Sequence, residues 1–252
     1  MVIDVAGVTA EVHCRCIENE CQFEDYVTDK PPVLKIAPTD ADIQNMQALM
    51  DSRARRRDAP LLRYPEKLLE MNIIYRALCE TLIDHDVLPI HGSALCMDGA
   101  AYVFIAPSNT GKSTHSRLWR EVYGDRVWMI NDDKPLLKVT DGGIMVCGFP
   151  WIDKQYAPGC NASAPLKAIV RLFRDNENHI ESLSDADGFQ MLLTRSYPYL
   201  FRRSLPQDAA CMAHSVALAK RVVCAAECYS LGCNMSPEAA IVSHDGMNAG
   251  KI

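Results

Sequence analysis

The spacing of hydrophobic residues changes several times along the chain, and each spacing predicts a different element. They alternate over residues 8–16, which is typical of a strand buried on one face. A helix is expected to begin at the capping-box-like sequence 39–42 and to run out at the arginine-rich segment 53–60. This segment is expected to be a solvated loop, with contact to an acidic partner or phosphate as the alternative. A second helix is expected over residues 65–84. These elements predict a small N-terminal α+β lobe over residues 1–85.

Shorter apolar runs dominate the remainder of the chain. Two of them, Ser93–Met97 and Ala101–Ile105, flank Asp98-Gly99, which is a strong signal for a two-residue hairpin turn. Lys112–Tyr123 has a helical pattern and stops at Gly124. Further strands are expected at Val127–Ile130, Leu136–Val139, Ile144–Cys147 and Ala168–Phe173, and further helices at 186–194 and 208–229. The predicted class is α/β, with a mixed, twisted sheet over residues 86–252.

Composition narrows the classes of protein that this pattern allows. Of the 252 residues, 48% are hydrophobic and 23% are charged, as in an ordinary soluble globular protein. The net charge of -6 argues against broad nucleic-acid binding, which needs a basic surface. No apolar run approaches the roughly 20 residues that span a bilayer. Asp4 also stands where a signal peptide would carry positive charge, so we expect a cytoplasmic protein with no membrane partner.

Eleven cysteines are an odd number, so they cannot all pair within one chain. In a reducing compartment the expected role is that of small apolar side chains. Two clusters have the composition of a possible metal site: Cys14, Cys16 and Cys21 near His13, and Cys224, Cys228 and Cys233, of which the first two are one helical turn apart. Neither cluster contains a C-x-x-C knuckle, so packing is favoured over zinc binding.

The segment after the second hairpin strand has the chemistry of a phosphate-binding loop. It reads Ala106-Pro107-Ser108-Asn109-Thr110-Gly111-Lys112-Ser113-Thr114 and lies between a predicted strand and a predicted helix. In this arrangement backbone N–H groups and the positive end of the helix face an anion, lysine adds charge, and a hydroxyl holds magnesium. The strict Walker A pattern is missed by one residue, because Ala106 replaces the first glycine. Asn109 stands where many such loops carry glycine, and asparagine is the non-glycine residue that best tolerates the left-handed conformation.

Two acidic residues follow at a distance that fits this loop. Asp132 and Asp133 end a hydrophobic run about twenty residues after Lys112, which is one helix plus one returning strand. This spacing would bring them beside Ser113, where one carboxylate could organise Mg²⁺ and the other could accept a proton from an attacking hydroxyl. An Asn-Asp-Asp sequence is also typical of an ordinary turn. The sequence leaves open which of the two acids would play which role.

The order of these motifs resembles HPr kinase/phosphorylase and its relatives, whose core is similar to the nucleotide domain of ATP-dependent phosphoenolpyruvate carboxykinase. The resemblance runs over residues 88–172, and Cys233-Asn234-Met235 resembles the small kinase-like relatives. The motifs are His91-Gly92, the Asp98-Gly99 hairpin, the loop, Asn131-Asp132-Asp133, Gly148-Phe149-Pro150-Trp151 and Pro165-Leu166-Lys167-Ala168-Ile169.

The resemblance implies a role for several of these residues. Lys112 would contact the β- and γ-phosphates, Ser113 would ligate magnesium, and Asp132 and Asp133 would match the catalytic and metal-binding aspartates. His91 would belong to the site, although alone it is an ordinary residue at the start of a strand. Trp151-Ile152-Asp153-Lys154 departs from the Trp-Ser-Gly-Lys-like segment of the small relatives. Lys154 is accordingly either a phosphate or acceptor contact or a surface lysine.

The sequence therefore predicts a kinase that transfers the γ-phosphoryl group of ATP to a hydroxyl acceptor. The nucleotide contacts are expected from Ser108, Asn109, Thr110, Gly111, Lys112, Ser113 and Thr114, and catalysis from Asp132, Asp133, His91 and Lys112. Mg²⁺ is the expected metal, held by Ser113, Asp132 and Asp133. GTP stays an alternative to ATP, the acceptor could be a peptide, a protein or a small molecule, and a homo-oligomer stays open. The alternatives to a kinase are a nucleotide-sensing binding protein and a partner-coupled ATPase.

Overall fold

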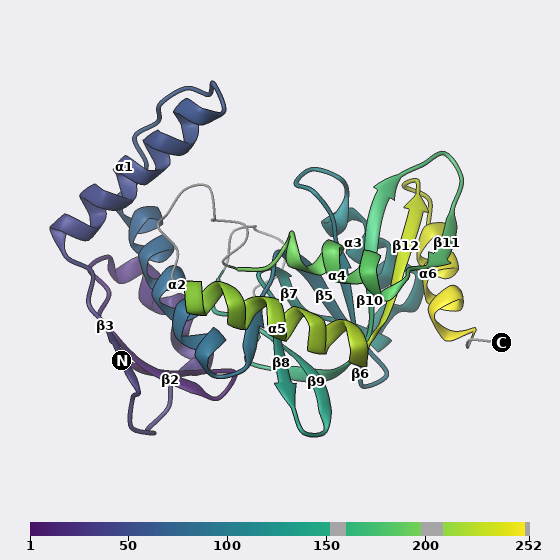
Figure 1. Cartoon of the computed structure of the whole chain (residues 1–252), viewed down its shortest axis with the longest axis horizontal. Helices are drawn as coiled ribbons and strands as arrows, with labels where there is room; N and C mark the ends of the chain where they lie inside the picture. The colour runs from purple at the N-terminus through teal and green to yellow at the C-terminus, as the bar shows by residue number, and fades with distance from the viewer. Residues whose placement is uncertain (152–159, 198–208, 250–252) are drawn as a thin grey trace.

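The computed structural model describes residues 1–151, 160–197 and 209–249. These residues form two β-sheets and six α-helices, joined by loops and short 3₁₀ segments. The N-terminal elements lie at one end of the long axis, and β12, β11 and α6 lie at the other (Figure 1). The helices are α1 (Asp40–Arg56), α2 (Glu66–Asp84), α3 (Lys112–Tyr123), α4 (Asp185–Leu193), α5 (Ala209–Ala225) and α6 (Glu238–Asn248). No helix in these ranges is long and apolar enough to cross a membrane.

The first sheet contains β1 (Val2–Val5), β2 (Val8–Val12) and β3 (Leu34–Ile36). Strand β2 is antiparallel to β1 and parallel to β3, and a 3₁₀ segment, η1 (Ile17–Tyr26), follows it. The strand predicted over residues 8–16 therefore ends early, at Val12. The reason is that the N–H groups of Arg15 and Cys16 donate to the carboxylate of Glu70 on α2, and not to a neighbouring strand.

Glu70 is fully buried and joins the segment after β2 to helix α2. Its carboxylate also accepts a hydrogen bond of 2.7 Å from Asn19 Nδ2. Replacing Glu70 with alanine should lower the free energy of unfolding by about 3 kcal/mol, because two backbone N–H groups and one amide would lose their acceptor. Urea denaturation measures the change. In the control Glu66→Ala, on the same helix but with a half-exposed side chain, the loss should stay below about 1 kcal/mol; equal losses would contradict the prediction.

Helix α1 begins as the sequence predicts and ends later. Thr39 forms a capping box with Asp42, because the Thr39 side chain accepts from Asp42 N and the Asp42 side chain accepts from Thr39 N. Arg53, Arg55 and Arg56 lie in the last turn of the helix, so the prediction of a loop beginning at residue 53 is wrong. Arginine is a good helix former, and its charge is favourable near the negative end of a helix.

The larger sheet has nine strands, and a single long strand, β10, joins its two parts. Its strands are β4 (Val87–Pro89), β5 (Gly92–Met97), β6 (Ala100–Ile105), β7 (Val127–Asp133), β8 (Leu136–Thr140), β9 (Gly143–Cys147), β10 (Ser163–Arg174), β11 (His179–Ser182) and β12 (Glu227–Cys233). The start of β10 pairs antiparallel with β9, whereas residues 168–174 lie parallel to β12 and residues 166–171 lie beside β6.

This pairing curls the sheet. One part runs β4-β8-β9-β10, and the other runs from β10 through β6 and β5 to β7 on one side and through β12 to β11 on the other. Strands β6, β10 and β12 are mutually parallel, while β5 is antiparallel to both β6 and β7. The predicted α/β class with a mixed sheet is confirmed at this level. Because β6, β10 and β12 point the same way, their C-terminal ends meet at one edge of the sheet.

The hairpin and the helix between residues 92 and 123 lie close to where the sequence predicts them. Strands β5 and β6 pair antiparallel, and the turn between them has positive φ at both Asp98 (51°) and Gly99 (82°). Two positive φ values are the mark of the type I′ turn that the Asp-Gly dipeptide predicts. Helix α3 covers Lys112–Tyr123 and ends at Gly124, whose φ of 57° combined with a ψ of -134° is easy only for glycine.

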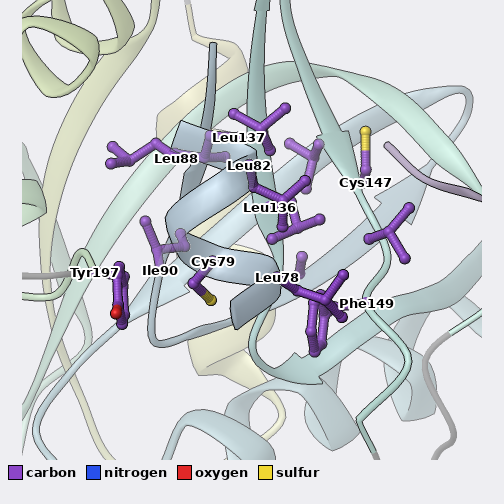
Figure 2. Packing of buried hydrophobic residues seen from close by; sticks show 14 of the residues in the cluster. Leu78, Cys79, Leu82, Leu88, Ile90, Leu136, Leu137, Cys147, Phe149 and Tyr197 are labelled. Carbon is purple, nitrogen blue, oxygen red and sulfur yellow. The ribbon is translucent and has the colours of Figure 1, made fainter. Parts of the chain in front are cut away.

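Helices cover both faces of the sheet around β10. Ala168, Val170 and Leu172 pack in one hydrophobic cluster with α3 and α6, while Ile169 packs in a second, larger cluster on the other face. The second cluster includes α2, α4 and α5 and continues into the N-terminal sheet. Figure 2 shows part of it, where Leu78 and Leu82 of α2 lie against Leu88, Leu136 and Leu137. The domain boundary between residues 85 and 86 stays a prediction.

The C-terminal part differs most from the sequence-based expectation. The helix predicted over 208–229 ends at Ala225, and Cys228 lies on strand β12, so Cys224 and Cys228 do not share a helical face. Residue 208, its expected start, lies outside the described residues. The run Cys228-Tyr229-Ser230-Leu231 becomes a strand because β10 offers a free edge for parallel pairing. Helix α6 and strand β11 were not predicted.

All eleven cysteines lie in the described part of the chain and are thiols. Burial raises the pKa of both Cys147 and Cys228 to about 11, so at pH 8 almost none of either is thiolate. Iodoacetamide at pH 8 should therefore modify the exposed Cys21 and Cys224 long before these two. Peptide mass spectrometry over a time course measures the order. Labelling of Cys147 in the native protein at the rate of Cys21 would contradict the prediction, and labelling in urea provides the control.

Candidate functional site

The phosphate-type loop joins the end of β6 to the start of α3. Ala106 is buried, and its φ is not positive, so a methyl group is accommodated where the strict pattern has glycine. Asn109 has a φ of 64°, the left-handed conformation that the sequence predicts for this position. Gly111 has a φ of 123° with nothing within 4 Å of a Cβ built on it, so glycine is required there for its backbone and not for space.

The start of α3 opens into a pocket of about 630 Å³. Gly111 caps the helix without a side-chain hydrogen bond, which leaves first-turn N–H groups directed at the pocket. Residues 109–115 line one side of it. The other side comes from the end of β10, with Leu172, Arg174 and Asp175, and from Cys233, Asn234 and Met235 at the end of β12. The parallel arrangement of β6, β10 and β12 thus places three strand ends around one cavity.

Lys112 lies at the base of this loop. It is 5% exposed, and its Nζ donates to the carbonyl oxygens of Ala106 (3.1 Å) and Pro107 (3.4 Å). The same Nζ is 3.3 Å from His91 Nε2. Because an ammonium can only donate, His91 accepts at Nε2, and its hydrogen is left on Nδ1. The lysine is therefore held close to the loop by acceptors that an anionic ligand could replace.

His91 connects Lys112 to Asp133. His91 Nδ1 is 3.1 Å from Asp133 Oδ1, and Lys134 Nζ donates to Asp133 Oδ2 at 2.6 Å. Burial alone would raise the pKa of Asp133, but the hydrogen bond from His91 and the charge of Lys134 outweigh it and hold this pKa well below its usual value. Asp133 is thus an ionised, buried carboxylate that fixes the orientation of His91.

Lys134 is itself held by aromatic rings. Its Nζ lies 3.9 Å from the ring centroid of Trp151 and 5.2 Å from that of Tyr75 on α2. Such cation–π contacts hold the side-chain nitrogen of Lys134 against the two rings. Trp151 belongs to the segment that the sequence singled out, whereas Lys154 lies outside the described residues. The lysine that pairs with Asp133 is therefore Lys134, which the sequence analysis did not identify.

Asp132 points to the other face of the sheet. It pairs directly with Ser93 across β5 and β7, and opposite residues of antiparallel strands share a face. Ser93 Oγ lies 2.7 Å from Ser116 Oγ on α3, so Asp132 is on the α3 side. Ser113 is one turn before Ser116 on the same side of that helix. The Asp132 Oδ1 atom is buried and has no hydrogen-bond partner among the described residues.

The structure thus gathers most of the predicted site residues and separates the two acids. Asn109, Thr110, Gly111, Lys112, Ser113 and Thr114 line the pocket, while Ser108 is exposed at the tip of the loop. His91 and Asp133 contact one another, and Asp132 lies on the opposite face. Within the described ranges, three or more His, Cys, Asp or Glu side chains do not come together as a metal site.

Arg174 is a pocket residue that the sequence analysis missed. Its guanidinium donates to the carbonyl oxygens of Asn109 (2.5 Å) and Thr110 (3.4 Å), so it holds the loop from across the cavity. The available signal was its position, because Arg174 ends a strand that runs parallel to the strand leading into the loop. Recognising that signal requires the order of strands in the sheet, which the sequence does not state.

The comparisons with known proteins add little to this geometry. No family model matches the chain, and no curated protein matches it. Among solved structures it is similar to the Hpr(Ser) kinase/phosphatase from Coxiella burnetii, at 13% sequence identity and a TM-score of 0.28, over 38% of this chain and 70% of that one. This is a distant structural relation, and at such a TM-score it carries no argument about activity.

Proposed function

We propose that the protein is a phosphotransferase that moves the γ-phosphoryl group of ATP to a hydroxyl acceptor. The observation that carries this proposal is the row Lys112–His91–Asp133, which connects the lysine of a phosphate-type loop to an ionised carboxylate through one histidine. A protein that only bound nucleotide would need the lysine and the loop. It would have no need of a carboxylate-oriented histidine beside them.

The triphosphate would bind in the pocket of about 630 Å³, with its phosphates at the first-turn N–H groups of α3. Lys112 would exchange the carbonyl oxygens of Ala106 and Pro107 for the phosphate oxygens. Arg174 lies across the same cavity and adds a second positive charge. ATP is the proposed nucleotide, with GTP as the alternative.

The buried Asp132 Oδ1 fits the metal that this chemistry requires. A carboxylate oxygen without a hydrogen-bond donor among the described residues is costly unless a cation neutralises it. Asp132 and Ser113 would hold Mg²⁺, since Asp132 on β7 and Ser113 on α3 lie on the same side of the sheet. When bound, Mg²⁺ would supply positive charge against the phosphate oxygens. Asp133 is already paired with His91 and Lys134, so we assign it a role in proton transfer through His91 and not in metal binding.

In the transfer, the acceptor oxygen forms a bond to the γ-phosphorus while the bond from that phosphorus to the β,γ-bridging oxygen breaks. ADP leaves with that oxygen, and the acceptor becomes a phosphate ester. The acceptor proton passes to His91 Nε2, which Lys112 vacates when it turns to the phosphates. Asp133 stabilises the resulting imidazolium through Nδ1, as the third member of a nucleophile–base–carboxylate set does.

The test is phosphoryl transfer by the full chain from γ-labelled ATP with Mg²⁺ to serine peptides, free serine and simple alcohols. Acceptor-dependent appearance of labelled ester together with equimolar ADP supports the proposal. Binding of Mg·ATP with no turnover for any acceptor would favour a nucleotide sensor. Acceptor-independent release of labelled phosphate would favour an ATPase, and either of these two results would overturn the kinase.

A further inference from the structure

A second groove lies on the other side of the phosphate loop. Its volume is about 450 Å³, and Ala106 and Pro107 form the wall that it shares with the loop. The remaining walls come from the end of β10 and from α4 with the residues directly after it. We call it the arginine groove, and its polar lining is Arg171, Asp187, Gln190, Thr194 and Arg195. None of these residues has a role in nucleotide binding as proposed above.

The two guanidinium groups of the groove lack carboxylate partners among the described residues. Arg171 donates to Ser230 Oγ, a neutral acceptor, at 3.1 Å through Nη2. The Arg195 side chain is half-buried and has no hydrogen bond or ion pair to a described residue. Its burial lowers the pKa of this arginine without any opposing group. A partly desolvated guanidinium of this kind is stabilised strongly by an anion that can accept from it.

The acid in the groove is already engaged. Asp187 Oδ2 accepts from Ser184 Oγ at 2.6 Å, at the start of α4, so this carboxylate is held by the helix cap. Two arginines and one aspartate leave a formal charge of +1. One carboxylate of the ligand would balance that charge, whereas a phosphate monoester carries nearly two negative charges near neutral pH.

The groove is also connected to the proposed catalytic residues. The backbone N–H of His91 donates to the carbonyl oxygen of Arg195 at 2.8 Å, and Ile90 bridges to Ser196. The segment that carries Arg195 is therefore fixed against the segment that carries His91. A ligand anchored by Arg195 would lie beside Pro107, next to the loop but outside the nucleotide pocket.

We propose that the arginine groove binds a carboxylate group of the phosphoryl acceptor. The acceptor is then a hydroxy compound that carries a carboxylate, such as a peptide with a free C-terminal or acidic side-chain carboxylate close to its serine. That the ligand is the phosphoryl acceptor rests on the proposed function, whereas binding of a carboxylate in the groove does not. Gln190 and Thr194 supply neutral hydrogen-bonding groups for the remainder of the molecule.

The test measures binding, so that it stays independent of turnover. The probes are N-acetyl-Gly-Gly-Ser with a free C-terminal carboxylate, the same peptide as its C-terminal amide, and inorganic phosphate. Each is titrated against the full chain by saturation-transfer NMR in the presence of Mg²⁺ and a non-hydrolysable ATP analogue. We expect the carboxylate peptide to bind at least about tenfold more tightly than the amide, a difference of about 1.4 kcal/mol.

Two variants locate the binding. Arg195→Gln and the exposed Arg171→Gln should each weaken the carboxylate peptide about tenfold and leave the affinity for the ATP analogue unchanged within twofold. Arg221→Gln, on α5, is the matched control: it removes an exposed ion pair with Asp86 and should change neither affinity. Thermal unfolding shows whether each variant is folded. If Arg195→Gln does not fold, Arg171→Gln decides the result.

Equal binding of the two peptides, no binding of the carboxylate peptide, or unchanged affinity in the arginine variants would overturn the groove proposal. Tighter binding of inorganic phosphate than of the carboxylate peptide would overturn its assignment to a carboxylate. Failure of the proposed function has a different signature, since it appears as absent binding of the ATP analogue or as absent acceptor-dependent transfer from ATP, while the peptide titrations could still be read.

Discussion

Replacing Lys112 with methionine should lower the rate of phosphoryl transfer by a factor of about 10²–10³, or about 3–4 kcal/mol. Methionine keeps most of the buried aliphatic stem and removes the ammonium. The group that is lost would stabilise charge on the β- and γ-phosphates, which grows in the transition state. Steady-state kinetics with labelled ATP measures the loss, and titration with a fluorescent ATP analogue measures the accompanying loss of affinity.

The control is Lys167→Met, because Lys167 is an exposed lysine on β10 outside the pocket. It should leave both the rate and the affinity unchanged. A Lys112→Met variant that is folded and retains more than a tenth of the wild-type rate would show that the loop does not hold the phosphates. The same result would remove the basis for the exchange of partners proposed for His91.

The parts of the fold that the sequence predicted well depend on local chemistry. The Asp98-Gly99 turn, the left-handed Asn109 and the end of α3 at Gly124 are each set by backbone preferences of one or two residues. The capping box at Thr39 is equally local. These signals fix the strand–loop–helix unit, and the unit in turn fixes where Lys112 and Ser113 lie.

The parts that were missed depend on partners far away in the chain. Strand β12 forms because β10 lies beside it, and its sequence also suits the helix that was predicted. Strand β2 stops because of Glu70, which is more than fifty residues away. The positions of Arg171 and Arg174 beside the phosphate loop follow only from the pairing of β6 with β10.

The candidate site shows the same division within two adjacent residues. The sequence identified Asp132 and Asp133 as a pair and placed them just after a strand. In the structure β7 continues through both, because β5 extends far enough to pair Ser93 with Asp132 and Gly92 with Asp133. Successive residues of a strand point to opposite faces, so the pair is divided between α3 and His91. The division suggests separate roles that the sequence left open.

Asparagine substitutions at these two acids should therefore have different effects on stability, and only the one at Asp133 should be destabilising. Asp133→Asn should lower the free energy of unfolding by about 3 kcal/mol, because it removes the charge that pairs with His91 and Lys134 in a buried place. Asp132→Asn should leave the metal-free protein as stable as the wild type or more stable, because it removes a buried carboxylate oxygen that has no partner among the described residues. Urea denaturation in EDTA measures both.

Magnesium separates the two variants further. Wild type and Asp133→Asn should both gain stability as Mg²⁺ is added with the ATP analogue, whereas Asp132→Asn should gain much less, since ligand binding stabilises by RT ln(1 + [L]/Kd). The rate of transfer should fall in both, by about 10²–10⁴ in Asp133→Asn through loss of the oriented base. If Asp133→Asn instead abolished the response to Mg²⁺ and Asp132→Asn preserved it, the roles of the two carboxylates would be exchanged, and His91 would have no place in proton transfer.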